Sequence, residues 1–213
     1  GTWLVEDIEN EVVEPGNVAM WWLGCTGVWF KTPENANITI DLWCGNGKRT
    51  HGDGLMKVGH QMANMCGGRL MQPNLRNVPF VIDPFAFKQV DAVLATHYHQ
   101  DHMSAEWAAH VINSGMTTTD ENGKEIPVPF IGPKKSVETW LKWGVPEDRC
   151  ITVKPGDSFK IKDLEIVCLD SFDRTCITTT DKTGPDREEL TGVCPTDMDD
   201  KAVNYLVKTP GGN

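Results

Sequence analysis

The 213-residue sequence has no apolar run long enough to cross a membrane, and its mean hydropathy is −0.34. A spanning helix needs about 20 consecutive apolar residues, so we expect no membrane protein. Positive charge is also scarce, because 20 Lys and Arg residues stand against 30 Asp and Glu, a net charge of −10. That balance argues against a nucleic-acid-binding surface. No basic segment followed by an apolar core opens the chain, so we expect no secretory signal and a cytoplasmic protein.

CxxC pairs are missing as well. The seven cysteines are odd in number and scattered along the chain, which predicts reduced thiols rather than a disulfide framework. Histidine is sparse, with six residues in all, yet His97, His99 and His102 fall within six positions of each other. This local concentration is the feature around which the function is predicted.

The histidines follow an apolar, strand-like run that covers residues 90–95. In extended chain, positions i and i+2 project to the same side, so His97 and His99 can direct their imidazoles at one point. Asp101 and His102 come next, close enough to complete that site or to serve a second ion. Imidazole and carboxylate suit divalent Zn, Mn or Fe. The alternative is a surface loop that merely happens to be rich in histidine.

Hydrophobic periodicity predicts an α/β protein with two parts. Residues 1–16 are expected to form an N-terminal arm with a short helix near residues 4–12, and residues 17–213 a single domain. The sequence predicts strands at 18–24, 26–31, 37–43, 90–95, 128–133, 150–153, 158–161, 164–169 and 202–208, helices at 104–113 and 136–143, and a polar surface loop at 116–126. The first three strands should form an antiparallel meander. A possible short helix at 55–65 lies in a long, Gly-rich connection.

The order of these motifs resembles the metallo-β-lactamase superfamily. The resemblance rests on Ile40-Asp41, on the His-x-His-x-Asp-His motif at 97–102, on Ile131-Gly132-Pro133 and on Lys154-Pro155-Gly156-Asp157. The segments 20–27, 41–45, 72–76, 171–175 and 198–205 further resemble the L-ascorbate-6-phosphate lactonases. The resemblance implies a four-layer αββα sandwich. It also implies an enzyme, a metal-dependent lactonase that opens the lactone ring of L-ascorbate 6-phosphate in ascorbate use.

The same resemblance implies roles for individual residues. His97 and His99 would hold the first metal, and Asp101 and His102 would face a second position and act in catalysis. A bound divalent ion, Mn or Zn, would activate water and polarise the lactone carbonyl. Asp101 would orient that water or take its proton.

The sequence departs from the superfamily pattern after the strand at 164–169, where another His ligand is usual. No His follows His110, so Asp173 is the expected substitute, with Asp170 a weaker alternative. An oxygen ligand would favour Mn or Mg. Asp173 could equally form an ion pair with Arg174, which is otherwise the candidate for binding the substrate phosphate.

The sequence stops after a turn at residues 209–213, and the superfamily places further ligands beyond this point. We therefore expect a domain that is incomplete at its C-terminus and that would need oligomerisation or a complementary piece. The expected partners are a small phosphorylated sugar-acid lactone and further copies of the chain, without nucleic acid or membrane. The rivals are another metal-dependent hydrolase of the same fold, acting on a phosphodiester or an ester, and an inactive metal-binding fragment.

Overall fold

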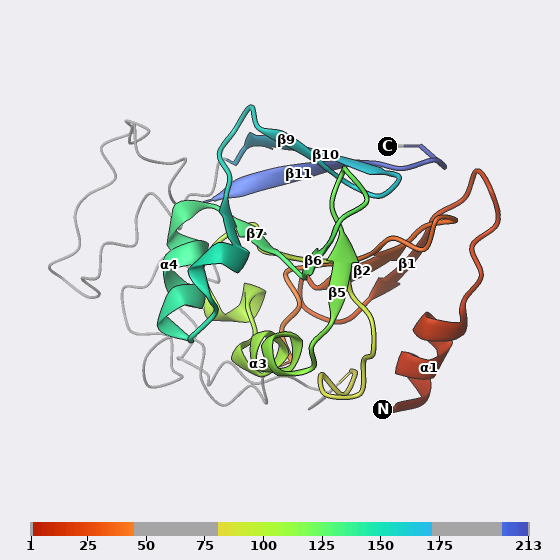
Figure 1. The fold of residues 1–213 in the computed structure, drawn as a ribbon, viewed down its shortest axis with the longest axis horizontal. Coiled ribbons are helices and arrows are strands. Elements are labelled where there is room, and N and C mark those ends of the chain that lie inside the picture. Colours follow the sequence, from red (N-terminus) through yellow and green to blue (C-terminus); the bar gives the residue numbers. More distant parts are fainter. Residues whose placement is uncertain (1, 45–80, 172–201, 213) are drawn as a thin grey trace, which may run out of the picture.

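A computed structural model describes residues 2–44, 81–171 and 202–212 of the chain (Figure 1). The described residues form a mixed α/β structure with three sheets, of six, three and two strands. The possible helix at 55–65, together with Asp173 and Arg174, lies outside the described residues. None of the described helices is both long and apolar enough to cross a bilayer.

The six-stranded sheet has the strand order β1-β2-β3-β4-β7-β8. Its first three strands form the predicted antiparallel meander, and the remaining strands run parallel to β3. The bounds are β1 (Ala19–Trp22), β2 (Val28–Lys31), β3 (Asn37–Ile40), β4 (Ala92–Leu94), β7 (Phe130–Gly132) and β8 (Cys150–Thr152). Because β3 and β4 are parallel neighbours, the residues that follow them meet at the same edge of the sheet.

The three-stranded antiparallel sheet packs against one face of this larger sheet. It consists of β9 (Ser158–Ile161), β10 (Leu164–Asp170) and β11 (Val203–Lys208), in the order β11-β10-β9. Alternate side chains of the two sheets interlock in a buried core that includes Ile38, Leu94, Ile131, Leu164, Ile166 and Val203. Burial of this apolar surface is the main force that holds the two sheets together.

Helices cover the opposite face of the six-stranded sheet. They are α1 (Thr2–Asn10), α3 (Ala105–Asn113) and α4 (Lys134–Lys142), and a second core joins them to the sheet. Trp29 of β2 stacks on Phe87 with 4.1 Å between the ring centroids, and Trp107 of α3 lies against both rings. Ser104 caps α3 by accepting a hydrogen bond from the Trp107 amide. The described residues thus form three successive layers, helices, large sheet and small sheet.

The N-terminal segment lies on this second core. Val5 and Ile8 of α1 are buried there, and the Lys31 ammonium donates to the Ile8 and Glu9 carbonyls at the end of the helix. Burial lowers the pKa of Lys31. The division into a separate arm and a domain stays a prediction.

The prediction of a polar surface loop at 116–126 was wrong. Residues 117–127 form a hairpin from β5 (Thr117–Thr119) and β6 (Glu125–Pro127). The Asp120 carboxylate holds the turn by accepting from the Asn122 and Lys124 amides. β-branched threonines favour extended backbone, and the polar composition concealed that preference. The helix predicted to start at Ser136 also begins earlier, at Lys134.

Candidate functional site

The site lies at the carboxyl edge of the parallel strands, where open α/β sheets commonly bind ligands. Asp41 follows β3, and the segment from Thr96 to His102 follows β4. The short 3-10 helix η1 (Gln100–His102) ends this segment just before α3. The three histidines therefore lie between a strand and a helix, as the sequence predicted.

Asp41 is the centre of the hydrogen-bond network at this edge. It is 3% exposed and has a φ of +54°, a conformation that only a few per cent of non-glycine residues adopt. Its carboxylate accepts from the Thr96 amide and from the Thr96 hydroxyl, both at 2.7 Å. The same carboxylate lies 2.9 Å from Nδ1 of His102. The cost of the unusual backbone angle is offset by these buried, charge-assisted contacts.

This network assigns the tautomers of two histidines. A carboxylate can only accept, so Nδ1 of His102 carries the proton and Nε2 keeps the lone pair. The Thr96 hydroxyl spends its proton on Asp41, and it therefore accepts from Nδ1 of His97 at 3.1 Å. Asp41 thus acts on His102 directly and on His97 through Thr96, leaving Nε2 of both rings able to bind a metal.

The three imidazoles lie together. Nε2 of His97 is 2.9 Å from Nδ1 of His99, and the ring centroids of His97 and His102 are 3.9 Å apart. Two nitrogens that each lie about 2.1 Å from one ion and meet it at a right angle are roughly 3 Å apart. The two nitrogens have the spacing of two ligands of a single divalent ion, and in this structure a hydrogen bond joins them. Across the described residues, no set of three or more His, Cys, Asp or Glu side chains is arranged to hold an ion.

The other predicted site residues differ in how they are placed. Asp101 lies on η1 between His99 and His102 and is half-buried. Asp170, the weaker alternative ligand, is exposed at the end of β10. No role for Asp173 or Arg174 can be drawn from the described residues.

Asp41 and Thr26 are site residues to which the sequence assigned no role. Asp41 stood in a family-like motif, but its contact with His102 spans 61 positions. Thr26 lies in the turn between β1 and β2, and its Oγ1 is 3.0 Å from Nδ1 of His102. One sequence signal could have indicated Asp41: it follows a predicted strand, as the histidines do, and the ends of two parallel neighbouring strands meet at one sheet edge.

The small sheet also reaches the site. His97 forms an isolated antiparallel bridge with Ala202, and the Val203 amide donates to the Thr96 carbonyl at 2.9 Å. Tyr205 of β11 donates from its hydroxyl to the Ala95 carbonyl at 3.0 Å. Burial raises the pKa of Tyr205 well above its usual value. The strand end that carries His97 is therefore held from both sheets.

Two packed sheets, with helices over the outer face of the larger one and a His-x-His-x-Asp-His loop at its carboxyl edge, match three of the four layers of the predicted metallo-β-lactamase-type sandwich in the described part of the chain. The predicted resemblance to the L-ascorbate-6-phosphate lactonases is confirmed. The chain is 55% identical over 212 residues to a protein of Escherichia coli O45:K1 (strain S88 / ExPEC) named probable L-ascorbate-6-phosphate lactonase UlaG. That alignment covers 100% of this chain and 56% of the relative, so the chain spans just over half the length of the curated relatives it matches.

Similar solved structures are more distant. CmlA, a diiron β-hydroxylase from Streptomyces venezuelae, aligns with a TM-score of 0.46 at 14% identity, covering 92% of this chain and 28% of that protein. The metallo-β-lactamase-fold protein YhfI from Bacillus subtilis aligns with a TM-score of 0.39 at 16% identity, covering 74% of this chain and 55% of that protein. No family model matches the chain.

Proposed function

We propose that this chain is part of a metal-dependent lactonase that opens the lactone ring of L-ascorbate 6-phosphate. The observation that carries the proposal is the 55% identity to proteins named for this activity, over an alignment that covers the whole chain. The position of the histidine motif at the carboxyl edge of the sheet supports it.

His97 and His99 are the proposed first ligands, with Asp101, His102 and Asp173 completing the metal-binding set. Two features support the histidines: the 2.9 Å spacing of the His97 and His99 nitrogens, and the proton that Asp41 fixes on Nδ1 of His102. The proposed ion is Mn or Zn. Imidazole donors suit either, and added carboxylate ligands shift the preference toward Mn.

A bound divalent ion would lower the pKa of a water molecule and polarise the lactone carbonyl. Asp101 is the proposed proton acceptor for that water, since it is half-buried beside the histidines on η1. The contact with Asp41 would hold the His102 ring in a fixed orientation at the reacting centre. Attack at the carbonyl carbon breaks the ring C–O bond and yields the open-chain acid, whose new hydroxyl receives the proton.

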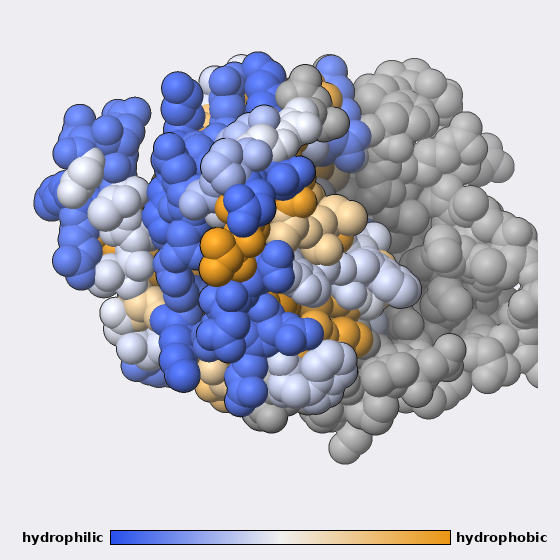
Figure 2. All heavy atoms as spheres, turned by 90° about the vertical axis from the view of Figure 1, so that its right-hand side faces the viewer, coloured by the Kyte–Doolittle hydropathy of each residue, from blue (hydrophilic) through white to orange (hydrophobic). Residues whose placement is uncertain are grey.

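The proposed substrate is a small phosphorylated sugar-acid lactone, with Arg174 as the candidate phosphate ligand. The net charge of −10 supports a small-molecule substrate over a nucleic acid. A cytoplasmic location without membrane attachment and a homo-oligomeric state remain part of the proposal. The oligomer is supported by the exposed Met20 and Trp22 of β1, the last strand of its sheet in the described part of the chain. Hydrophobic residues are visible among hydrophilic ones on the face drawn in Figure 2.

The test is hydrolysis of L-ascorbate 6-phosphate by the full-length protein with Mn²⁺ or Zn²⁺ added. His97→Ala should lower turnover by more than about 100-fold, because loss of a direct ligand exceeds the usual cost of losing a group behind it. His110→Gln is the matched control, since His110 lies on α3 and contacts the Phe87 carbonyl.

Each result separates the rivals. Turnover of a phosphodiester but not of the lactone would favour another metal-dependent hydrolase of the same fold over the lactonase. Metal binding that depends on His97, without turnover of either substrate, would favour the inactive metal-binding protein. Equal activity of His97→Ala and wild type would refute the proposed metal site.

A further inference from the structure

The turn between β1 and β2, residues 23–27, lies at the same sheet edge as the histidine motif and contacts it. Its Thr26 hydroxyl is 3.0 Å from Nδ1 of His102, although 76 positions separate the two residues. His102 Nδ1 also faces the Asp41 carboxylate at 2.9 Å. The single Nδ1 proton of His102 therefore meets two acceptors that come from two different strand ends.

The turn has a backbone that is shaped for this approach. Cys25 has a φ of +51°, and hydrogen bonds from Leu23 N to Gly27 O and from Gly27 N to Gly24 O close the turn. The Trp22 indole N–H donates to the Cys25 carbonyl at 2.8 Å and braces the turn from outside.

Gly27 permits the close contact with Asp41. A Cβ at Gly27 would lie 3.0 Å from the Asp41 carbonyl oxygen, a distance that real Cβ atoms rarely reach against backbone. The turn therefore packs directly on the main chain of Asp41. The two acceptors of His102 are held together as one unit.

We propose that Thr26 is a positioning residue that fixes the ring plane of His102 so that its Nε2 points to the metal. The Asp41 carboxylate and the Thr26 hydroxyl reach Nδ1 from two different strand ends, so losing either one should loosen the ring plane that both help to hold. The inference rests on the proposed function, because His102 acts there as a metal ligand. Thr26 itself touches neither the metal nor the substrate in this role.

The exposure of Thr26 separates this role from a structural one. Thr26 is exposed, so in its absence water can satisfy Nδ1, and an exposed hydrogen bond contributes little net folding energy. Removing the hydroxyl should therefore affect how the ring is held more than how the chain folds.

The test compares Thr26→Val, Thr26→Ser and wild type in the full-length protein. Thr117→Val is the matched control, because Thr117 is another exposed threonine whose hydroxyl makes one side-chain hydrogen bond, to Glu125. Mn²⁺ and Zn²⁺ affinities are measured by calorimetry. The ring ¹⁵N–¹H signals of His102 are recorded in the metal-free protein, and the unfolding midpoint is measured for each variant.

Thr26→Val should bind metal about tenfold more weakly, the lower end of the cost of losing a group behind a metal ligand. It should shift or broaden the His102 ring signals and leave the unfolding midpoint unchanged. Thr26→Ser should restore both affinity and signals. Wild-type affinity and unchanged ring signals in Thr26→Val would overturn the inference and leave the lactonase proposal intact. Failure of wild type to open the lactone, with metal affinity still dependent on Thr26, would overturn the lactonase and leave the inference intact.

Discussion

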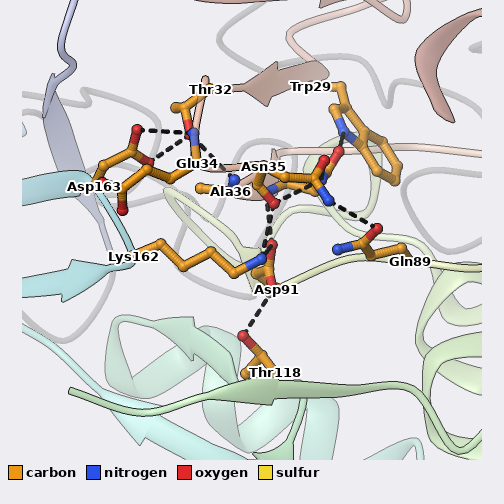
Figure 3. A network of polar contacts seen from close by, with 11 residues as sticks. Trp29, Thr32, Glu34, Asn35, Ala36, Gln89, Asp91, Thr118, Lys162 and Asp163 are labelled. Atoms are coloured by element: carbon orange, nitrogen blue, oxygen red, sulfur yellow. Dashed lines mark hydrogen bonds and ion pairs between the residues drawn. The ribbon is translucent and has the colours of Figure 1, made fainter. Parts of the chain in front are cut away.

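Two buried aspartates lie at opposite ends of the same pair of parallel strands. Asp41 follows β3 at the carboxyl edge, and Asp91, which is 1% exposed, precedes β4 at the amino edge. Each accepts from one main-chain amide, one threonine hydroxyl and one side-chain nitrogen. For Asp91 the donors are the Asn37 amide at 2.7 Å, the Thr118 hydroxyl at 2.7 Å and the Lys162 ammonium at 3.0 Å (Figure 3).

The nitrogen partner decides what each end can do. Lysine carries only donors, and the Lys162 ammonium donates to the Asp91 carboxylate and to the Asn35 carbonyl, so it offers no lone pair to a metal. His102 at the other end uses one ring nitrogen on Asp41 and has a second that can bind a ligand. The same carboxylate environment therefore gives a closed structural contact at one edge and a candidate metal site at the other.

The closed end also joins the two sheets. Lys162 and Asp163 form the turn between β9 and β10, and Figure 3 shows them reaching residues of the turn between β2 and β3. Thr32 donates its hydroxyl proton to Asp163, and Lys162 donates to the Asn35 carbonyl at 2.8 Å. Substituting the two aspartates should therefore have different consequences. Loss of Asp91 should lower the stability of the fold, and loss of Asp41 should lower metal affinity.

The largest expected effect on folding comes from Lys162→Met. It leaves the Asp91 carboxylate buried without its cation, which should lower the free energy of unfolding by about 3 to 5 kcal/mol. Urea denaturation measures this, with Lys160→Met as the control because Lys160 is exposed on β9. Adding Asp91→Asn to Lys162→Met should recover part of the loss. Equal stability of Lys162→Met and the control would show that the pair has no structural role.

Asp41→Asn should produce the opposite pattern. Asn tolerates the φ of +54°, but its amide cannot accept from all three donors as the carboxylate does. Metal affinity should fall about 10- to 100-fold, as calorimetry can measure, because the proton on Nδ1 of His102 is no longer fixed. Asp91→Asn is the matched variant and should retain metal affinity while losing stability. If Asp91→Asn weakened metal binding as much as Asp41→Asn, the two ends would not be separate in function.

The sequence predicted what local patterns can carry. The strands of the two larger sheets, the helix after the motif and the grouping of His97, His99 and His102 all follow from runs and spacings within about ten residues. Both aspartate networks were missed because their partners are distant in sequence, 61 positions for Asp41 and His102 and 71 for Asp91 and Lys162. A carboxylate in a strand-like run gives no local sign of which donor it will meet.

Backbone conformation was hidden for a similar reason. Asp41, Cys25 and Lys162 all have positive φ, a region that sequence reasoning assigns to glycine and sometimes asparagine. Cys25 and Lys162 lie in turns between antiparallel strands, where the turn geometry calls for positive φ, and Asp41 lies directly after β3. The hairpin at residues 117–127 was missed because its polar composition outweighed the preference of threonine for strands.

High pH should weaken the layer between the two sheets. Burial raises the pKa of the Cys168 thiol to about 11 from 9.0. Between these values the thiol ionises in the unfolded chain and stays neutral in the folded one, so stability falls as pH rises above 9. By about pH 10.5 the loss should reach roughly 2 kcal/mol. Urea denaturation with reductant from pH 8 to 10.5 measures it, and Cys168→Ala should reduce the slope while Cys25→Ser, at an exposed thiol, should not.

Tyr205→Phe should give the smallest effect, and it tests whether the sheets support the site as well as the fold. The Tyr205 hydroxyl donates to the Ala95 carbonyl at 3.0 Å, directly before Thr96, so its loss removes one contact between β11 and the strand end that carries His97. We expect the free energy of unfolding to fall by about 1 kcal/mol, the usual net value of one hydrogen bond. Metal affinity should be unchanged, because the Val203 amide still holds the Thr96 carbonyl. A drop in affinity as large as that of Asp41→Asn would instead mean that the small sheet sets the orientation of His97, and the contrast between the two strand ends would have to include β11.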